Sequence, residues 1–304
     1  MRDTPLVLRC RGARLAASVA LPDGRCRAAV AALHPADDPS RRQFLFEHLA
    51  TVLPERGVAV LRYDRRPAPP DRDVPYELQA EDLAHGLAAL AEVTGPVPTG
   101  LWGFSQGAWV ALLTAARRAD IAFLVLVGCS AVSPARRSCS AVPYRIWRAG
   151  FGPGCRAELA RLRAAYEGYE RGQLARPQAQ RVVDAYADRA WFGLSWVPRV
   201  LPEAPDWDDM DFDPAVSIGR LRCPVLAFYG ADEWVPVPES IAVWRAAYPH
   251  PARLAIHELA GTAHHPTYGG RRELAAISPE YTARLTGWLD DVISGAIDRQ
   301  PQQG

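Results

Sequence analysis

Continuous apolar runs alternate along the chain with longer segments of helical periodicity. Three of these runs contain only apolar residues, which is typical of strands buried on both faces of a sheet; they are 28–33, 58–61 and 121–127. Further strands are expected just before Ser105 and at 223–230 and 253–259, and helices at 76–93, 238–247 and 279–297. Strands that alternate with helices of this length predict an α/β fold with a mostly parallel sheet and helices on both faces.

Two local signals refine this pattern near the start of the chain. The β-type runs 5–10 and 13–21 are joined by Arg11-Gly12, which predicts an antiparallel hairpin at a sheet edge. Ser40 is expected to cap the helix that ends before Gly57, because a serine side chain can accept a bond from the first free N–H groups of a helix.

The pattern changes between residues 131 and 212. This segment has no convincing buried strand, contains helices broken by prolines, and is rich in tyrosine and tryptophan. We therefore expect a core made of residues 1–130 and 213–304 and a helical cap, or lid, at 131–212 above an apolar substrate pocket. Between residues 136 and 163 there are seven arginines against one glutamate, Glu158, and this charge is expected to form a solvated face.

The stretch Gly103-Phe104-Ser105-Gln106-Gly107 lies between an apolar run and a helical segment. A serine in a sharp turn between a strand and a helix is typical of a nucleophile elbow, and glycines two residues before and after it leave room for its hydroxyl. The sequence therefore predicts Ser105 as a nucleophile, provided that a base, an acid and an oxyanion hole are placed around it.

A serine hydroxyl needs an imidazole to accept its proton and a carboxylate to orient that imidazole. Of the seven histidines, His264 and His265 follow the last expected strand in a loop, and we prefer His264 as the base. Asp232, just after the strand 223–230, is the preferred acid because ligands of such sheets bind at the carboxyl ends of strands. Glu233 is a second choice, with a solvated loop position as its simpler interpretation.

The tetrahedral intermediate also needs hydrogen-bond donors for its oxyanion. The backbone N–H of Gln106, at the start of the helix after Ser105, is one expected donor. The second is expected from the loop after the strand 28–33, where Pro35 has no N–H and Ala36 is the next residue.

Composition narrows the function further. The 304 residues contain 35 basic and 34 acidic side chains, so nothing favours nucleic acid or an anionic membrane as a partner. All the basic residues are arginine, which excludes a P-loop lysine, a Schiff base and a Ser-Lys dyad. The six cysteines show no metal-ligand spacing, and neither a signal peptide nor a membrane span is evident. We expect a cytoplasmic protein without a metal or other cofactor.

The elbow, the turn Gly230-x-Asp232-x-x-Val235-Pro236 and the loop Gly261-x-x-His264, in this order, resemble the α/β-hydrolase superfamily over residues 5–295. The segments Gly-Phe-Ser-Gln-Gly-Ala-Trp and Asp211-Phe212-Asp213-Pro214 look like its prolyl-oligopeptidase-like and esterase branch. Two departures stand out: His34-Pro35 replaces the common His-Gly after the third strand, and Arg65-Arg66-Pro67-Ala68 replaces the common Arg-Gly-x-Gly after the fourth.

The motifs together predict a serine hydrolase that cleaves an ester or amide of a hydrophobic small molecule or short peptide through an acyl-enzyme. Two alternatives stay open. One is a thioesterase or acyltransferase whose arginines at 136–163 meet a phosphorylated carrier, and the other is a non-hydrolytic binding or cyclisation protein on the same fold. A homodimer is also left open.

Overall fold

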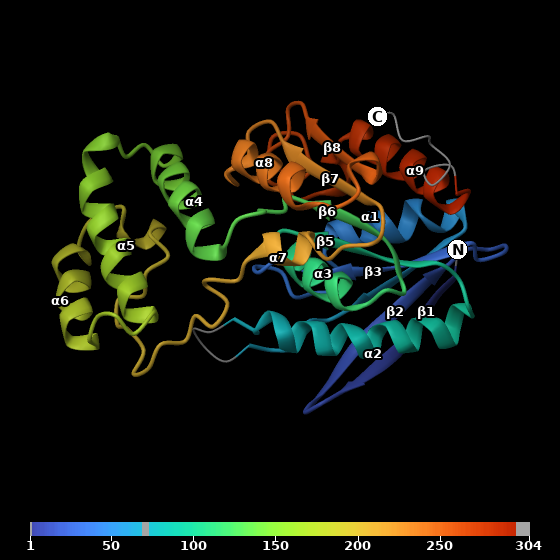
Figure 1. Ribbon diagram of the computed structural model, residues 1–304, viewed down its shortest axis with the longest axis horizontal. Helices are drawn as coiled ribbons and strands as arrows, with labels where there is room; N and C mark the ends of the chain where they lie inside the picture. The colour runs from blue at the N-terminus through green and yellow to red at the C-terminus, as the bar shows by residue number, and fades with distance from the viewer. Residues whose placement is uncertain (1, 69–72, 296–304) are drawn as a thin grey trace.

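A sheet of eight strands, in the order β1-β2-β4-β3-β5-β6-β7-β8, forms the centre of the computed structural model, which describes residues 2–68 and 73–295 (Figure 1). The strands are β1 (Arg2–Cys10), β2 (Ala13–Leu21), β3 (Ala28–Leu33), β4 (Val58–Tyr63), β5 (Thr99–Phe104), β6 (Ile121–Val127), β7 (Val225–Gly230) and β8 (Leu254–Leu259). β1 pairs with β2, and β2 with β4, in antiparallel register, while all other neighbours are parallel. The predicted α/β fold with an edge hairpin is confirmed.

Helices cover both faces of the sheet. Apolar side chains of α1 (Phe44–Val52) and α9 (Pro279–Ile293) pack on one face, and those of α2 (Tyr76–Thr94), α3 (Gln106–Arg117) and α8 (Val237–Ala247) on the other. β4 has no exposed position because both of its faces are covered, which explains the apolar run 58–61. Its Arg62 is buried and forms ion pairs with Asp3 and Glu47. Among the described helices, none combines the length and apolar character that crossing a bilayer requires.

Two expected helix boundaries differ from the structure. Ser40 does not cap α1: the helix begins at Phe44 after Gln43, and the Ser40 hydroxyl instead accepts a bond from the N–H of Arg42 at 3.1 Å within a turn. The last helix was expected to reach residue 297. It ends at Ile293, and residues 296–304 lie outside the described part of the chain.

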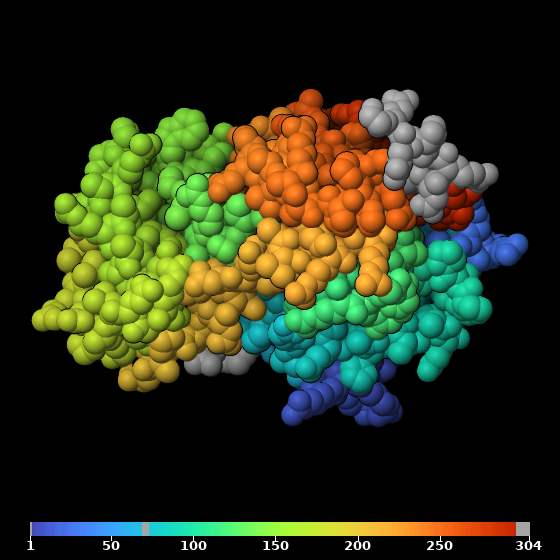
Figure 2. All heavy atoms as spheres, viewed as in Figure 1, coloured from blue at the N-terminus to red at the C-terminus, as the bar shows by residue number. Residues whose placement is uncertain are grey.

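Residues 131–212, called the cap segment below, are mainly helical and follow β6. Their helices α4 (Pro134–Arg148), α5 (Arg156–Glu170) and α6 (Arg176–Tyr186) lie to the left of the sheet in Figure 1 and form a lobe in Figure 2. The lobe has an apolar cluster of its own, which includes Val142, Leu162, Val183 and Trp191. Where the chain enters and leaves it, the N–H of Ala135 donates to the carbonyl of Met210 at 2.9 Å.

The remaining elements are short and join these parts. They are α7 (Pro214–Ile218) and the 3₁₀ turns η1 (Pro54–Arg56), η2 (Pro153–Cys155), η3 (Phe192–Leu194), η4 (Pro251–Arg253) and η5 (Leu274–Ala276). α7 carries the chain from the cap segment back to β7, and its first N–H groups are capped by the side chain of Asp213, which accepts from the N–H of Ala215 at 2.9 Å.

Candidate active site

Ser105 lies in the sharp turn between β5 and α3, with φ 54° and ψ −114°. A side chain at Gly103 would place its Cβ 2.6 Å from the carbonyl oxygen of Gly107, and one at Gly107 would lie 2.5 Å from that of Leu33. These glycines therefore let α3 pack back against β5 and the end of β3, which is a different reason from the hydroxyl clearance that the sequence suggested. The turn is fixed by the Ser105 N–H, which donates to the Val127 carbonyl at 2.9 Å.

The imidazole of His264 lies in the loop after β8, between two aromatic rings. Its centroid is 5.0 Å from that of Phe104 and 4.1 Å from that of Trp234. A Cβ at Gly128, which has φ 59°, would lie only 2.8 Å from His264 Cε1, so the absence of a side chain there makes room for the ring. The Nδ1 atom is 2.8 Å from Glu233 Oε1. Nε2 is buried and has no hydrogen-bond partner among residues 2–68 and 73–295.

Ser105 and His264 are brought to the same end of the sheet but are not hydrogen bonded to each other. The His264 ring packs on Phe104, the residue before the serine, and against Gly128, the residue after the carbonyl that holds the Ser105 N–H. The hydrogen bond between a nucleophile and its base is often long or poorly aligned in a ligand-free site and forms fully only when a substrate binds.

Glu233, and not Asp232, contacts the histidine, which corrects the choice made from the sequence. The Glu233 side chain is 1% exposed, and its Oε1 also accepts from the N–H groups of Trp234 at 3.0 Å and Val235 at 3.3 Å. The Asp232 side chain is 54% exposed and turns away from His264. The physical reason for this difference lies in the turn after β7. Glu233 follows Asp232 in this turn, and its longer side chain points inward.

Asp232 instead connects the core to the cap segment. Its Oδ1 accepts from the hydroxyl of Tyr144 at 2.9 Å, and its Oδ2 lies 3.4 Å from an Nη atom of Arg148; both partners are on α4. Two consecutive carboxylates therefore serve different parts of the molecule.

His265, the alternative base, faces another environment. Its ring packs against Phe104 at 4.8 Å and Phe44 at 5.7 Å, and burial lowers the pKa of His265 to about 3. Within the described ranges, no carboxylate forms a hydrogen bond with the His265 ring, whereas Glu233 forms one with His264.

The loop after β3 is anchored by His34. This side chain is buried, and its Nε2 donates to the carbonyl of Tyr63 at 2.6 Å. Burial, with a contribution from the nearby charge of Arg65, lowers the pKa of His34 to about 3, so the ring is neutral. The histidine therefore ties the end of β3 to the end of β4 before the chain reaches Pro35.

Arg65 joins the two residues that were predicted as oxyanion donors. Its guanidinium donates to the carbonyls of Pro35 at 3.0 Å and Ala36 at 2.7 Å, and to Gln106 Oε1 at 2.7 Å. Because the peptide between Pro35 and Ala36 is trans, its N–H points opposite to the carbonyl that Arg65 holds. The Gln106 amide also donates to the carboxylate of Asp73. In the sequence Arg65 is recognisable only as part of a departure from the common motif, and this role is not evident from it.

A cavity of about 230 Å³ lies between the core and the cap segment. Its walls combine apolar rings with charged groups of both signs, and they include Ala36, Asp73, Tyr76, Gln106, Arg137, Arg163, Trp196, Asp206, Asp208 and Asp209. Ala36 and Gln106, the residues predicted as oxyanion donors, border this cavity. Its charged lining differs from the apolar pocket that the sequence predicted.

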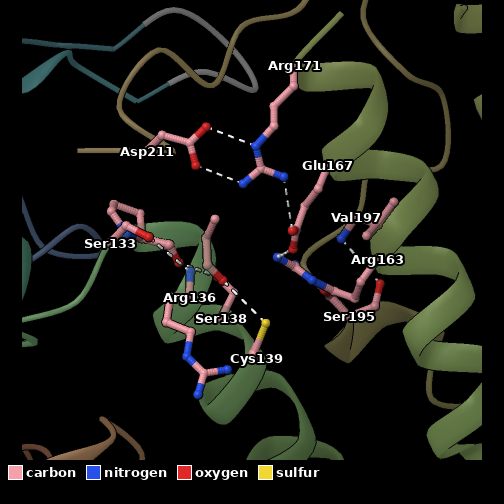
Figure 3. A network of polar contacts seen from close by, with 12 residues as sticks. Ser133, Arg136, Ser138, Cys139, Arg163, Glu167, Arg171, Ser195, Val197 and Asp211 are labelled. Atoms are coloured by element: carbon pink, nitrogen blue, oxygen red, sulfur yellow. Dashed lines mark hydrogen bonds and ion pairs between the residues drawn. The ribbon is translucent and has the colours of Figure 1, made fainter. Parts of the chain in front are cut away.

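The arginines of the cap segment do not form a single solvated face, as the sequence had suggested. Arg163 is buried, donates to Glu167 at 2.7 Å and to the carbonyl of Ser195, and is neighboured by an ion pair between Arg171 and Asp211 (Figure 3). Arg136 pairs with Glu239 on α8 at 3.1 Å. Within the described residues, no group of three or more histidine, cysteine, aspartate or glutamate side chains is placed to hold a metal ion.

Several solved structures share this fold. The structure is similar to a proline iminopeptidase from Mycobacterium smegmatis (TM-score 0.60, 16% identity, 96% of this chain and 100% of that one). It is also similar to the alpha/beta hydrolase GrgF from Penicillium sp. sh18 (0.60, 15%, 98% and 100%) and to Est1E from Butyrivibrio proteoclasticus (0.57, 15%, 96% and 99%). At these identities the likeness shows the fold alone. No curated protein sequence matches the chain.

The sequence itself carries the assignment. The sequence model of the Alpha/beta hydrolase family matches residues 13–277, which include the elbow, the acidic turn after β7 and the histidine loop. The chain belongs to the alpha/beta hydrolase family.

Proposed function

We propose that this hydrolase is a serine hydrolase that cleaves an ester or amide bond through an acyl-enzyme on Ser105. The observation that carries the proposal is the 2.8 Å contact between His264 Nδ1 and the buried Glu233 carboxylate, beside a serine held in a strained elbow. This is the base-and-acid arrangement that activates a serine hydroxyl.

The proposed reaction begins when Ser105 Oγ attacks the substrate carbonyl carbon while its proton passes to His264 Nε2. Glu233 accepts from Nδ1–H, which keeps Nε2 free to take that proton and stabilises the imidazolium that forms. When the tetrahedral intermediate collapses, the bond to the leaving group breaks and His264 returns the proton to that group. Water then repeats the same steps on the acyl-enzyme and releases the acid.

The N–H groups of Gln106 and Ala36 are the proposed donors to the oxyanion. Support comes from Arg65, which holds the carbonyls of Pro35 and Ala36 and the side chain of Gln106 at the rim of the cavity. A donor fixed in advance stabilises developing charge without reorganisation, and the loss of one typically reduces the rate by about 10²–10³.

The alternative of a carrier-dependent thioesterase has less support. Three of the seven arginines at 136–163 are already neutralised, Arg136 by Glu239, Arg148 by Asp232 and Arg163 by Glu167. We therefore propose a small-molecule or short peptide substrate. A purely binding or cyclising role would leave the buried pair of His264 and Glu233 without a use.

The test is labelling and turnover with Ser105→Ala as the matched variant. The wild-type chain should gain the mass of one phosphonyl group from a fluorophosphonate probe and hydrolyse p-nitrophenyl butyrate, while Ser105→Ala should do neither. Ser130→Ala, which changes another buried serine near the end of β6, should behave as wild type. Equal turnover by Ser105→Ala and wild type would overturn the proposal.

A further inference from the structure

Arg137, on α4, places its guanidinium among three tryptophan rings. Its Cζ lies 4.7 Å from the ring centroid of Trp109, 5.3 Å from that of Trp234 and 5.7 Å from that of Trp196. These rings favour a cation by cation–π attraction. They do not supply acceptors for the five N–H groups of the side chain.

No hydrogen bond or ion pair to this guanidinium is formed by the part of the chain that the structure describes. Its Nε is buried and has no partner. Two other arginines of α4 form ion pairs, Arg136 with Glu239 and Arg148 with Asp232. Arg145 is exposed to solvent and stacks on Trp196 at 5.1 Å. Of these four arginines, Arg137 alone has a buried N–H group without a partner among the described residues.

Burial lowers the pKa of the Arg137 guanidinium, and the neighbouring charge of Arg163 lowers it further. The nearby side chains of Tyr76, Asp73 and Glu233 act in the opposite direction. An arginine stays protonated in proteins, so the protein holds a partly uncompensated positive charge at this point. An anion that entered the cavity would compensate it.

The cavity gives this charge a position relative to the reaction centre. Arg137 lines the same space as Ala36 and Gln106, the proposed oxyanion donors. Trp196 also lines this space and has φ 58°. Among the described residues other than glycine, only Trp196 and Ser105 have a positive φ. Such strain persists where the surrounding structure holds a residue in a required place. Here it holds the ring that faces the Arg137 guanidinium.

The charges around the cavity select the kind of anion. Four carboxylates also line it, those of Asp73, Asp206, Asp208 and Asp209, and they repel a dianionic phosphate more strongly than a singly charged group. The planar fork of a guanidinium matches a carboxylate in a bidentate arrangement. The rings of Trp196 and Trp207 in the cavity wall suit an aliphatic chain that leads to the charged end.

We propose that Arg137 binds a free carboxylate on the substrate, which makes half-esters or half-amides of dicarboxylic acids the preferred substrate class. The inference rests on the proposed hydrolase function, because it assigns the part of the substrate that lies away from the bond cleaved at Ser105. The tryptophans hold the guanidinium in place, and the carboxylate supplies the acceptors that the protein lacks.

The test compares esters that differ only at the end of the acyl chain. The p-nitrophenyl half-esters of adipic, suberic and sebacic acids are measured against p-nitrophenyl hexanoate, octanoate and decanoate. Arg137→Gln should lower the ratio of kcat/KM for at least one half-ester over its neutral partner by about 10- to 100-fold, the range expected for charge-assisted hydrogen bonds. Arg137→Lys should retain part of the preference, since it keeps the charge but not the fork.

Arg145→Gln is the matched control, because Arg145 stacks on the same Trp196 but is exposed and does not line the cavity. It should keep the wild-type ratio. The proposal is overturned if the ratio is unchanged in Arg137→Gln for all three chain lengths, or if Arg145→Gln lowers it equally.

A binding measurement separates this inference from the hydrolase proposal. With Ser105→Ala protein, monomethyl suberate should change the tryptophan fluorescence at concentrations at least about tenfold lower than methyl octanoate. The added Arg137→Gln change should remove that difference. Carboxylate binding that depends on Arg137 without turnover by wild type would overturn only the hydrolase function. Turnover with no such dependence would overturn only the carboxylate site.

Discussion

Neutralising Glu233 tests the proposed acid with an unusually close control, because the adjacent residue is also a carboxylate. In Glu233→Gln the side chain keeps its length, and the N–H groups of Trp234 and Val235 still favour an oxygen at the position of Oε1. The bond from His264 Nδ1 can therefore persist while the negative charge is lost. The expected effect is chiefly electrostatic.

The size of that effect follows from the geometry. With Nδ1 and Oε1 2.8 Å apart, the charge centres of an imidazolium and the carboxylate lie at a distance of about 4 Å. At an effective dielectric constant of about 20 their attraction is about 4 kcal/mol, which corresponds to about a thousandfold in rate. Removal of the charge from a triad acid in another serine hydrolase lowers kcat by about 10⁴, so the two magnitudes agree to within about a factor of ten.

Asp232→Asn removes the same charge one residue away. The Asp232 side chain is 54% exposed, and its pair with Arg148 at 3.4 Å is screened by water. We expect kcat/KM for p-nitrophenyl butyrate to stay within about fivefold of wild type, because an exposed pair contributes at most about 1 kcal/mol. The assay compares both variants with wild type at constant pH, with circular dichroism to establish that each is folded. A loss in Asp232→Asn that equals or exceeds the loss in Glu233→Gln would refute the assignment.

Three further predictions concern residues around the site. Arg65→Gln should lower kcat by about 10- to 100-fold with a smaller change in KM, because it releases the proposed oxyanion loop. The control Arg66→Gln, which removes the bond to Asp82, should affect stability alone. Steady-state kinetics and thermal unfolding distinguish the two variants. Gly128→Ala should reduce turnover by about 100-fold or more, because its Cβ would collide with the imidazole of His264. Gly150 also has a positive φ but faces open space, so Gly150→Ala should be as active as wild type. Burial raises the pKa of Asp209 to about 6. The protonated carboxyl group therefore makes its full contribution to the free energy of unfolding below the ordinary pKa of 3.8, and this contribution is lost as the pH rises through about 6. Asp209→Asn should therefore raise the free energy of unfolding by at most about 3 kcal/mol at about pH 8 and leave it unchanged at about pH 3.5; an equal gain at both values in urea titrations would contradict this.

The sequence was most informative where local chemistry sets the structure. Apolar runs bounded by turns located β3, β4 and β6, because a strand covered on both faces favours apolar residues at most positions. The elbow around Ser105 was recognisable because a strand, a tight turn and a helix leave few residue choices. Both features depend on neighbours in the chain, so they can be predicted from it.

The features that could not be predicted depend on side-chain direction and long-range contacts. Asp232 and Glu233 are adjacent, and which of them points inward is decided by the turn after β7, where the Asp232 N–H bonds to the carbonyl of Thr262. Arg65 acts on a loop about 30 residues earlier in the chain, which spacing alone does not reveal. The same holds for Arg137, whose three tryptophans come from three separate segments.

The hydrogen bond between Ala135 and Met210 makes the cap segment interchangeable in principle. Because its two ends meet at 2.9 Å, the segment enters and leaves the core at one point, and a different insertion would need only ends that meet in the same way. Most of the cavity wall opposite the elbow belongs to this segment, whereas Ser105, His264 and Glu233 belong to the core. Under the proposed function, selectivity and reactivity are carried by separable units of the chain. Exchange of caps between relatives can alter what such a fold accepts while its reaction centre is left unchanged.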